Sequence, residues 1–263
     1  MTDPIPTDDR GLLLGDGLFE TLLADRGRLV WFEPHAARLA AGCTVLGLPV
    51  PPAERLRQAA EAAIAEAGLG AARAAVRLTW TAGSGGRGLD RPEALSPRLI
   101  ATAAPAPAPS GSAALMLASL RRNEGSPASR LKSLAYLDNV LARREAKAVG
   151  ADEAVMLNIA GEIACAAAAN LFWIKDGRLF TPALDCGVLD GIARAVVLEA
   201  AAQAQTTAVE VRAGPEALAA AEAIFVTNSL IGVRPVRRLD DRDLAPHALV
   251  DRLAKAVSER MRV

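Results

Sequence analysis

The chain is poor in the residues that metal sites, disulfide frameworks and membrane spans require. Its 263 residues include only two histidines and three cysteines, and Cys43, Cys165 and Cys186 have no metal-ligand spacing. An odd number of scattered cysteines favours a reducing compartment over a disulfide framework. No uncharged apolar run reaches the roughly 18 residues that predict a membrane span. We therefore expect a cytoplasmic protein that holds no metal.

The sequence also has no excess of either charge. Lys plus Arg and Asp plus Glu number 30 each, so the formal net charge is zero, and the two signs are interspersed. This balance removes the usual electrostatic basis for binding nucleic acid or an anionic membrane. The first residues, MTDPIPTDDRG, lack the basic start and apolar core of a secretory signal. A hydrophobic content of 51% is typical of a globular protein with one large or two modest domains.

Helical and strand-like patterns are mixed in both halves of the chain, and several strands pair as hairpins. This mixture favours an α+β fold over a doubly wound parallel sheet. Turn residues predict hairpins around Gly27 and Gly177, and Pro34 predicts a helix start. Predicted helices cover 34–48, 53–68, 134–150, 191–204, 215–221 and 247–261, and predicted strands cover 17–25, 27–32, 72–83, 97–104, 114–120, 152–158, 162–174, 177–182, 207–213 and 222–228.

The segment APAPAPSGSA at 104–113 predicts a break between two domains. Alternating Pro and Ala favour extended, polyproline-like backbone and exclude a helix. We therefore expect a smaller N-terminal α/β domain over 1–103, a linker over 104–114 and a larger C-terminal domain over 115–263.

Lysine is scarce, since the chain has four lysines against 26 arginines. Lys147, Lys175 and Lys255 lie in a charged helix face, a hairpin turn and an amphipathic helix, which are solvent positions. Lys132 instead stands among leucines in RLKSLAYL. Apolar neighbours help an amine to lose its proton and act as a covalent catalyst, which arginine cannot do. The alternative, a lysine that caps a turn or reaches the surface, remains open at this point.

Three further segments have features of a phosphate site. In LDGIAR at 189–194, a glycine just before a predicted helix leaves backbone N–H groups at the positive end of the helix dipole. VTNSLIG at 226–232 ends a strand with three short polar side chains, and HAARL at 35–39 contains Arg38, whose forked guanidinium suits phosphate. Taken alone, each segment is more typical of an ordinary helix end, a turn or a surface arginine.

In combination these segments resemble the class IV (fold-type IV) aminotransferase family, whose members bind pyridoxal 5′-phosphate (PLP). That group includes branched-chain and D-amino-acid aminotransferases, R-selective amine transaminases and 4-amino-4-deoxychorismate lyase. The matching segments, in family order, are GLLLGDGLFET at 11–21, HxxRL at 35–39, K-x-x-x-Y at 132–136, DEAVMLN at 152–158, ANLFW at 169–173, TP at 181–182, GVLDGIAR at 187–194 and TNSLIGVRPV at 227–236.

The resemblance implies a D-amino-acid-aminotransferase-like, homodimeric PLP enzyme with its active site between two domains. Lys132 would form the Schiff base with PLP and then move the α-proton of the substrate. The other implied cofactor residues are Arg38, the backbone N–H groups of Ile192 and Ala193, and Asn228 with Ser229 at the phosphate, and Tyr136 beside the lysine or the ring oxygen.

One position departs from the family pattern, which has a glutamate four residues after the glycine of GEIACAAAANLFW. That glutamate pairs with the pyridine nitrogen, and Cys165 stands in its place. A carboxylate keeps the ring nitrogen protonated, so that the ring withdraws electrons from the carbanion; a neutral thiol does this less well. We expect slower transamination as a result. Glu162 is a poor substitute, because residues 162 and 165 of one strand face opposite sides.

The resemblance implies an aminotransferase that exchanges an amino group between an amino acid or amine and a 2-oxo acid. The alternative within the family is aminodeoxychorismate lyase, which releases pyruvate and 4-aminobenzoate, and ANLFW with the GSGGRG loop most resembles that enzyme. An alternative outside catalysis is a catalytically impaired PLP-binding protein. The glycine-rich segment 83–92 is expected to form a mobile loop over the site, with Arg87 or Arg91 at a substrate carboxylate.

Overall fold

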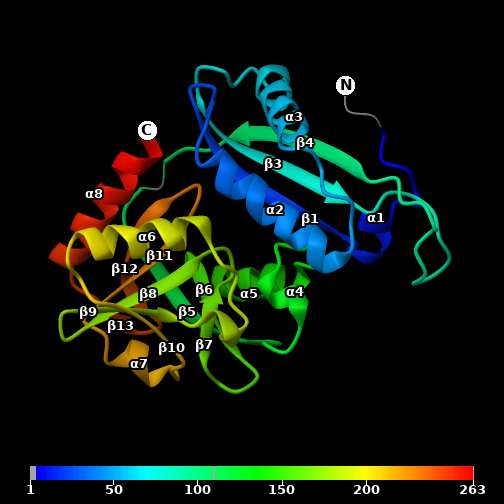
Figure 1. Ribbon diagram of the computed structural model, residues 1–263. Coiled ribbons are helices and arrows are strands. Elements are labelled where there is room, and N and C mark those ends of the chain that lie inside the picture. Colours follow the sequence, from blue (N-terminus) through cyan, green and yellow to red (C-terminus); the bar gives the residue numbers. More distant parts are fainter. Residues whose placement is uncertain (1–3, 109, 263) are drawn as a thin grey trace. The chain divides into compact units, whose positions relative to one another are not determined.

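The computed structural model describes residues 4–108 and 110–262, and its contacts divide the chain into two compact units. Unit 1 consists of Met1–Pro107 and Leu131–Ala135, and unit 2 of Ala108–Arg130 and Tyr136–Val263. Both units combine helices with strands (Figure 1). The predicted α+β class is confirmed.

Unit 1 is a small sheet covered by helices. Its elements are α1 (Arg10–Leu14), β1 (Gly17–Asp25), β2 (Arg28–Leu29), α2 (Phe32–Leu46), α3 (Ala53–Glu66), β3 (Arg73–Thr81) and β4 (Arg98–Pro105). The strands form an antiparallel sheet in the order β2-β1-β3-β4, and α2 and α3 lie across it (Figure 1). Side chains that alternate along β1, such as Leu18 and Leu22, are buried with Leu39 and Cys43 of α2. This core fixes β1 and α2 against each other.

The segment that carries Lys132 belongs to unit 1 through backbone hydrogen bonds to β1. The N–H of Phe19 donates to the carbonyl of Lys132 at 2.8 Å, and the N–H of Leu134 donates to the carbonyl of Gly17 at 3.0 Å. Leu131 also packs against the unit 1 core. Residues 131–135 therefore belong to unit 1, although the chain before and after them belongs to unit 2. The domain boundaries expected from the sequence placed these five residues in the C-terminal domain.

The expected linker is partly strand. β4 continues to Pro105 and the next strand starts at Ala113, which leaves 106–112 as the connection. Within it, Pro109 lies outside the described residues. A proline can end β4 because an edge strand has N–H groups that need no partner in the sheet.

Unit 2 contains the larger sheet. Its elements are β5 (Ala113–Arg122), α4 (Pro127–Arg130), α5 (Leu137–Ala148), β6 (Glu153–Asn158), β7 (Ile163–Ala166), β8 (Asn170–Lys175), β9 (Arg178–Pro182), the 3₁₀ helix η1 (Leu184–Cys186), α6 (Ile192–Gln203), β10 (Ala208–Val211), α7 (Glu216–Ala219), β11 (Ala223–Asn228), β12 (Gly232–Leu239), β13 (Arg242–Asp243) and α8 (Ala248–Arg262). The strand order is β10-β9-β8-β11-β12-β5-β6-β7, with β13 paired to β12.

This sheet is mixed and curls, because β7 at one end of the order also contacts β8 and β9. The pairs β9–β10, β5–β12 and β5–β6 are parallel, and the other pairs are antiparallel. Helices α6 and α8 pack together over β11 and β12, whereas α5 packs on β5 and β6 (Figure 1). None of the helices in the described part of the chain is long and apolar enough to cross a membrane.

The prediction of one continuous strand over 162–174 is wrong. The chain turns between β7 and β8, where the N–H of Ala166 donates to the carbonyl of Ala169 at 2.9 Å. The side-chain amide of Asn139 donates to the carbonyl of Ala167 at 2.7 Å and holds this turn. The alanine-rich sequence between β7 and β8 contains no residue that favours a turn. Hydrogen bonds from elsewhere in the fold therefore determine where the strand is interrupted.

Candidate active site

A buried ion-pair network in unit 1 surrounds Arg38. On α2, His35 and Arg38 are three residues apart and lie on one helix face, and this face meets Glu20 of β1. Glu20 accepts from Nε of Arg38 at 2.8 Å and from Nη2 at 2.7 Å, and its Oε2 lies 2.7 Å from Nδ1 of His35. Glu20 and His35 are both about 1% exposed. The carboxylate therefore fixes the position of the guanidinium.

The electrostatics of this network keep Glu20 ionised and His35 neutral. Burial alone would raise the pKa of Glu20, but the hydrogen bonds from Arg38 and His35 outweigh it and lower the pKa to about 2. Burial lowers the pKa of His35, and the charges of Arg38 and Lys132 add to that effect against the opposing carboxylate. Nδ1 of the neutral ring then donates to Glu20. Its Nε2 is buried without a hydrogen-bond partner among the described residues.

Lys132 lies in the same unit as this network. Its Nζ is 4.3 Å from the ring centroid of Phe19, a neighbour on β1 to which the lysine carbonyl is also hydrogen-bonded. The hydroxyl of Ser133 is buried and has no partner within the described chain. By contrast, Lys147 and Lys255 are exposed. Among the lysines, Lys132 is thus the one whose backbone carbonyl is hydrogen-bonded to β1.

The start of α6 in unit 2 has the backbone geometry that an anion site requires. Gly191 is the N-cap, and the first helical hydrogen bond runs from Ala195 to the carbonyl of Gly191. The N–H groups of Ile192 and Ala193 therefore point out of the helix at its positive end. A Cβ on Gly191 would lie 1.9 Å from Oδ1 of Asn170, so a larger residue here would displace the Asn170 side chain.

An unpartnered hydroxyl lies next to this helix start. Thr227 of β11 stands directly opposite Asn170 of β8, and cross-strand neighbours of this kind share one face of the sheet. Thr227 is 0% exposed, yet its Oγ1 has no hydrogen-bond partner among the residues that the structure describes. A buried polar group without a partner is costly. A phosphate at the α6 N-terminus would supply the acceptor, so these residues fit the phosphate of PLP.

Asn228 and Ser229 follow Thr227 at the end of β11. The Asn228 amide donates to the carbonyl of Ala168 at 2.9 Å, and its Oδ1 accepts from the N–H groups of Leu230 and Ile231 at 2.9 and 3.0 Å. The side chain of Asn228 therefore shapes the turn after the strand. Its assignment to the phosphate, like that of Ser229, stays a prediction.

Tyr136, the sole tyrosine of the chain, precedes α5. Its carbonyl accepts from the N–H of Val140 at 3.1 Å and starts the helix. Tyr136 and Asn228 line one unit 2 pocket of about 590 Å³. The structure thus brings these two sequence-predicted residues together.

Cys165 of β7 is a buried neutral thiol. It is 6% exposed, stands opposite Met156 and packs with Cys186. Burial raises its pKa, and the charge of Arg122 only partly offsets this effect. Glu162 lies outside β7 and pairs with Arg212 at 2.9 Å. Cys165 therefore offers no negative charge to a pyridine nitrogen.

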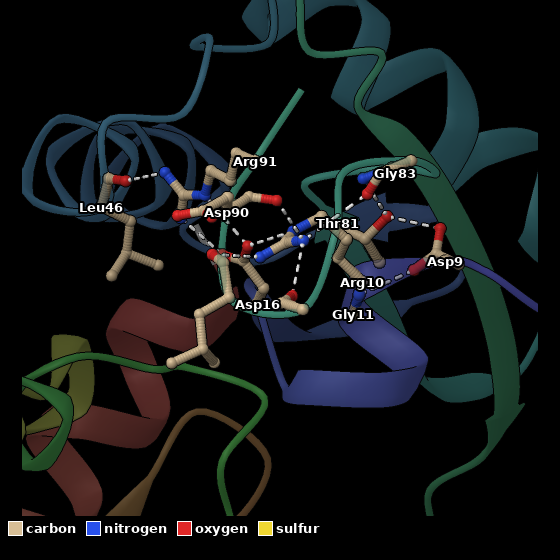
Figure 2. Close-up of polar contacts among 12 residues, drawn as sticks. Asp9, Arg10, Gly11, Asp16, Leu46, Thr81, Gly83, Asp90 and Arg91 are labelled. Carbon is tan, nitrogen blue, oxygen red and sulfur yellow. Dashed lines mark hydrogen bonds and ion pairs between the residues drawn. The ribbon is translucent and has the colours of Figure 1, made fainter. Parts of the chain in front are cut away.

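The two arginines of the glycine-rich loop have different surroundings. Arg91 donates to Asp16 through Nε at 2.9 Å and Nη2 at 2.5 Å, and through Nη1 to the carbonyl of Leu46 at 2.6 Å (Figure 2). Arg87 is exposed, and its side chain has no hydrogen bond or ion pair with the described residues. Of the two, Arg87 is the cation available to a ligand.

Sequence reasoning missed several polar residues around these positions. These residues lie inside motifs that the sequence analysis had singled out: Asp16 and Glu20 in GDGLFET, His35 in HAARL and Asn170 in ANLFW. A charged or amide side chain inside an otherwise apolar run is the sequence feature that could have indicated a functional role for them. Thr227 was one of the three short polar side chains noted in VTNSLIG, and its register opposite Asn170 is what distinguishes it from Asn228 and Ser229.

Known proteins are similar to this chain over nearly its whole length. A family model described as amino-transferase class IV matches residues 17–239. A putative branched-chain-amino-acid aminotransferase of Methanocaldococcus jannaschii is 30% identical over 97% of this chain and 88% of its own length. An aminodeoxychorismate lyase of Bacillus subtilis is 29% identical over 89% of this chain and 80% of its own length. The crystal structure of 4-amino-4-deoxychorismate lyase from Pseudomonas aeruginosa superposes with a TM-score of 0.88 at 33% identity, over 98% of this chain and 96% of that chain.

Proposed function

From the premise that the chain belongs to the class IV aminotransferase family, we propose that it transfers an amino group between an amino acid or amine and a 2-oxo acid, with Lys132 as its catalytic residue. The family match confirms the predicted resemblance, and enzymes of this family use PLP. The observation that carries the residue assignment is the position of Lys132, whose segment is hydrogen-bonded to β1 and whose Nζ lies over Phe19.

Lys132 is proposed to bind the cofactor and to move a proton. When bound, PLP supplies an aldehyde that an amine can capture and a ring that withdraws electrons from the substrate Cα. The Nζ of Lys132 would remove the proton from Cα and return it during transfer. The ring of Phe19 lies beside this amine, with 4.3 Å between Nζ and the ring centroid. His35 is neutral and buried, so it adds no competing positive charge.

The phosphate ligands proposed are those that the family resemblance implies. In unit 2 the N–H groups of Ile192 and Ala193 would donate to the phosphate, together with the hydroxyl of Ser229 and the turn shaped by Asn228. In unit 1 the guanidinium of Arg38, held by Glu20, would add a positive charge. We add Thr227 to this set, because its buried hydroxyl lacks an acceptor among the described residues.

Tyr136 and Cys165 are the residues proposed to contact the cofactor ring. The phenol of Tyr136 would donate to the ring oxygen or orient Lys132. Cys165 would face the pyridine nitrogen, where a thiol of raised pKa leaves that nitrogen without a carboxylate partner. Slower transamination follows from this substitution.

Aminodeoxychorismate lyase is the second candidate function, since relatives with that name are 29% and 33% identical. The same cofactor and lysine would serve an elimination that releases pyruvate and 4-aminobenzoate. Pyruvate formed from aminodeoxychorismate without an added 2-oxo acid would establish the lyase. Amino transfer from a donor to pyruvate or 2-oxoglutarate would establish the aminotransferase. A protein that binds PLP and reacts with no donor would be the impaired alternative.

We also propose that the enzyme is a cytoplasmic homodimer. Three free cysteines fit a reducing compartment. Helix α1 exposes Leu12, Leu13 and Leu14 by 62%, 62% and 46%, and apolar side chains grouped on a surface often mark an interface. Light scattering of the purified protein would measure the oligomer, and a mass of one chain would contradict the dimer.

The test of the proposed function is the Lys132→Ala variant. The wild type should turn yellow with PLP and transfer amino groups, whereas Lys132→Ala should lose the absorption of lysine-bound cofactor and all measurable transfer. Lys255→Ala, which changes an exposed lysine of α8, is the control and should behave as wild type. Turnover by Lys132→Ala at the wild-type rate would refute the assignment.

A further inference from the structure

Arg122 is a buried cation of unit 2 without a counter-charge. It is the last residue of β5 and is 6% exposed. Its guanidinium donates to two backbone carbonyls and one side-chain amide, and no carboxylate among the described residues forms an ion pair with it. Arginine keeps its proton in proteins, and burial of an uncompensated charge is costly. The charge therefore acts on any group that is bound nearby.

Three oxygen atoms hold the guanidinium of Arg122 in place. Its Nε donates to the carbonyl of Gly187 at 2.7 Å, and its Nη1 donates to Oδ1 of Asn139 at 3.4 Å. Its Nη2 donates to the carbonyl of Ser129. These residues belong to the segment before α6, to α5 and to α4. All three acceptors are neutral, so they orient the guanidinium but leave its positive charge uncompensated.

The guanidinium lies close to the thiol of Cys165. Cys186 and Val188, the chain neighbours of Gly187, pack with Cys165 in one buried cluster. The strands that carry Arg122 and Cys165, β5 and β7, both pair with β6. Burial raises the pKa of the thiol, and the charge of Arg122 lowers it in opposition. The position of Cys165 is therefore within reach of this positive charge.

The other titratable groups around this thiol do not cancel the charge of Arg122. Glu153 of β6 also acts on Cys165, in the opposite sense and more weakly than Arg122. Glu153 is paired with Arg143 at 3.2 Å, and burial raises the pKa of its carboxyl. Cys186 is a neutral thiol, since burial raises its pKa to about 11. The net charge that acts on the position of Cys165 is therefore positive.

We propose that the uncompensated charge of Arg122 keeps the pyridine nitrogen of bound PLP unprotonated. This inference rests on the proposed function, which assigns Cys165 to that nitrogen. A protonated pyridine is a cation, and a positive charge nearby disfavours it. A carboxylate at position 165 would have neutralised the arginine and accepted a hydrogen bond from the protonated ring. The thiol of Cys165 does neither.

Arg122 thus limits how strongly the cofactor ring can withdraw electrons. An unprotonated pyridine is a weaker electron acceptor than a protonated one, so removal of the Cα proton by Lys132 should be slower. Arg122 acts through its charge and is assigned no contact with the substrate. The slow transamination expected for this chain then has two causes, the missing carboxylate and the buried cation.

The test is NMR of PLP labelled with ¹⁵N at the ring nitrogen and bound to the purified protein at pH 7. The signal reports whether the nitrogen carries a proton and needs no turnover. The wild type should show an unprotonated nitrogen. Arg122→Met removes the charge and should raise the ratio of protonated to unprotonated nitrogen about tenfold. Arg122→Lys keeps the charge, loses the forked hydrogen bonds and should match the wild type.

Two results would overturn the proposal. One is a protonated nitrogen in the wild type. The other is Arg122→Lys with the same signal as Arg122→Met, because the hydrogen bonds of the arginine would then matter and its charge would not.

A second pair of variants neutralises Arg122 without removing it, and decides the question if Arg122→Met does not fold. Asn139→Asp puts a carboxylate at the oxygen that lies 3.4 Å from Nη1 of Arg122, and should raise the protonated ratio about tenfold. Asn139→Leu has a similar size and no charge, so the nitrogen should stay unprotonated. Both variants lose the hydrogen bond to the carbonyl of Ala167. Equal signals from the two would contradict the role of charge.

The proposed function and this inference fail in different ways. A wild type that binds PLP with a protonated nitrogen and transfers amino groups refutes only the role of Arg122. A wild type with an unprotonated nitrogen that transfers no amino group refutes the function and supports the role of Arg122. A wild type that binds no PLP refutes both.

Discussion

Glu20 and Arg38, 18 residues apart in the chain, meet through two N–H···O bonds of 2.8 and 2.7 Å. The carboxylate is almost wholly buried, and the guanidinium is 19% exposed. The pair thus joins β1 to α2 and leaves one side of the arginine accessible to solvent. Because Glu20 already fixes the guanidinium of Arg38, the side chain does not have to change its conformation when an anion binds. The free-energy cost of anion binding is lower as a result.

Glu20→Gln should destabilise unit 1 and weaken PLP binding. Breaking a buried ion pair leaves the arginine without its counter-charge and typically costs about 3–5 kcal/mol. Urea unfolding of the apo-protein measures this cost, and absorbance titration measures cofactor affinity. Glu33→Gln is the matched control, because Glu33 pairs with Arg57 at the surface and such pairs contribute less than about 1 kcal/mol. Equal losses from both variants would contradict the role of burial.

The stability of the wild type should fall with acid over two ranges. The pKa of Glu20 is lowered from 4.5 to about 2, so its contribution is complete above pH 4.5 and is lost as pH falls toward 2. The pKa of His35 is lowered from 6.5, so the unfolded chain takes up a proton that the folded chain resists, and stability declines below pH 6.5. Urea midpoints between pH 7 and pH 3 measure both effects.

The difference between wild type and Glu20→Gln isolates the first of these effects. It should be constant from pH 7 to about pH 5 and should shrink by roughly half by pH 3. A difference that stays constant down to pH 3 would show that Glu20 titrates normally in the folded protein.

Thr227→Val should have opposite effects on the apo-protein and on cofactor binding. Valine has the same shape and removes a buried hydroxyl that lacks a partner in the described chain, so apo stability should rise by up to about 1 kcal/mol. Loss of a hydrogen bond to a charged phosphate should weaken PLP binding about tenfold, or ~1.4 kcal/mol. Thr207→Val changes an exposed threonine and should do neither. Unchanged PLP affinity in Thr227→Val would remove this residue from the phosphate site.

Cys165→Glu should restore a carboxylate partner for the pyridine nitrogen and speed the half-reaction with an amino donor. A tenfold gain corresponds to about 1.4 kcal/mol of activation free energy. Cys165→Ser, which stays neutral, should react at the wild-type rate, and thermal unfolding would report the cost of the new buried charge. Cys186→Ser, in the same cluster, controls for packing. A correctly folded Cys165→Glu that is no faster than Cys165→Ser would place the ring nitrogen elsewhere.

Local patterns in the sequence predicted most secondary structure. The helix over 53–68 is α3 because Pro51 and Pro52 start it and a glycine follows it. The hairpin of β8 and β9 forms around Asp176 and Gly177, whose positive φ angles suit such a turn. The strand β12 was not predicted, since VRPVRR mixes proline and arginine. It is a strand because β11 and β5 pair with its two edges.

The sequence by itself determined the class of fold, the family and the special place of Lys132, because turn residues, periodic apolar positions and short motifs are local chemistry. Only the tertiary structure decided which charges are paired. Arg91 is bound to Asp16 and Arg87 is exposed, although both occur in one loop and look alike in sequence. It also brought the Lys132 segment to β1 and Thr227 opposite Asn170. Such pairings depend on strand register and burial, which join residues that are distant along the chain.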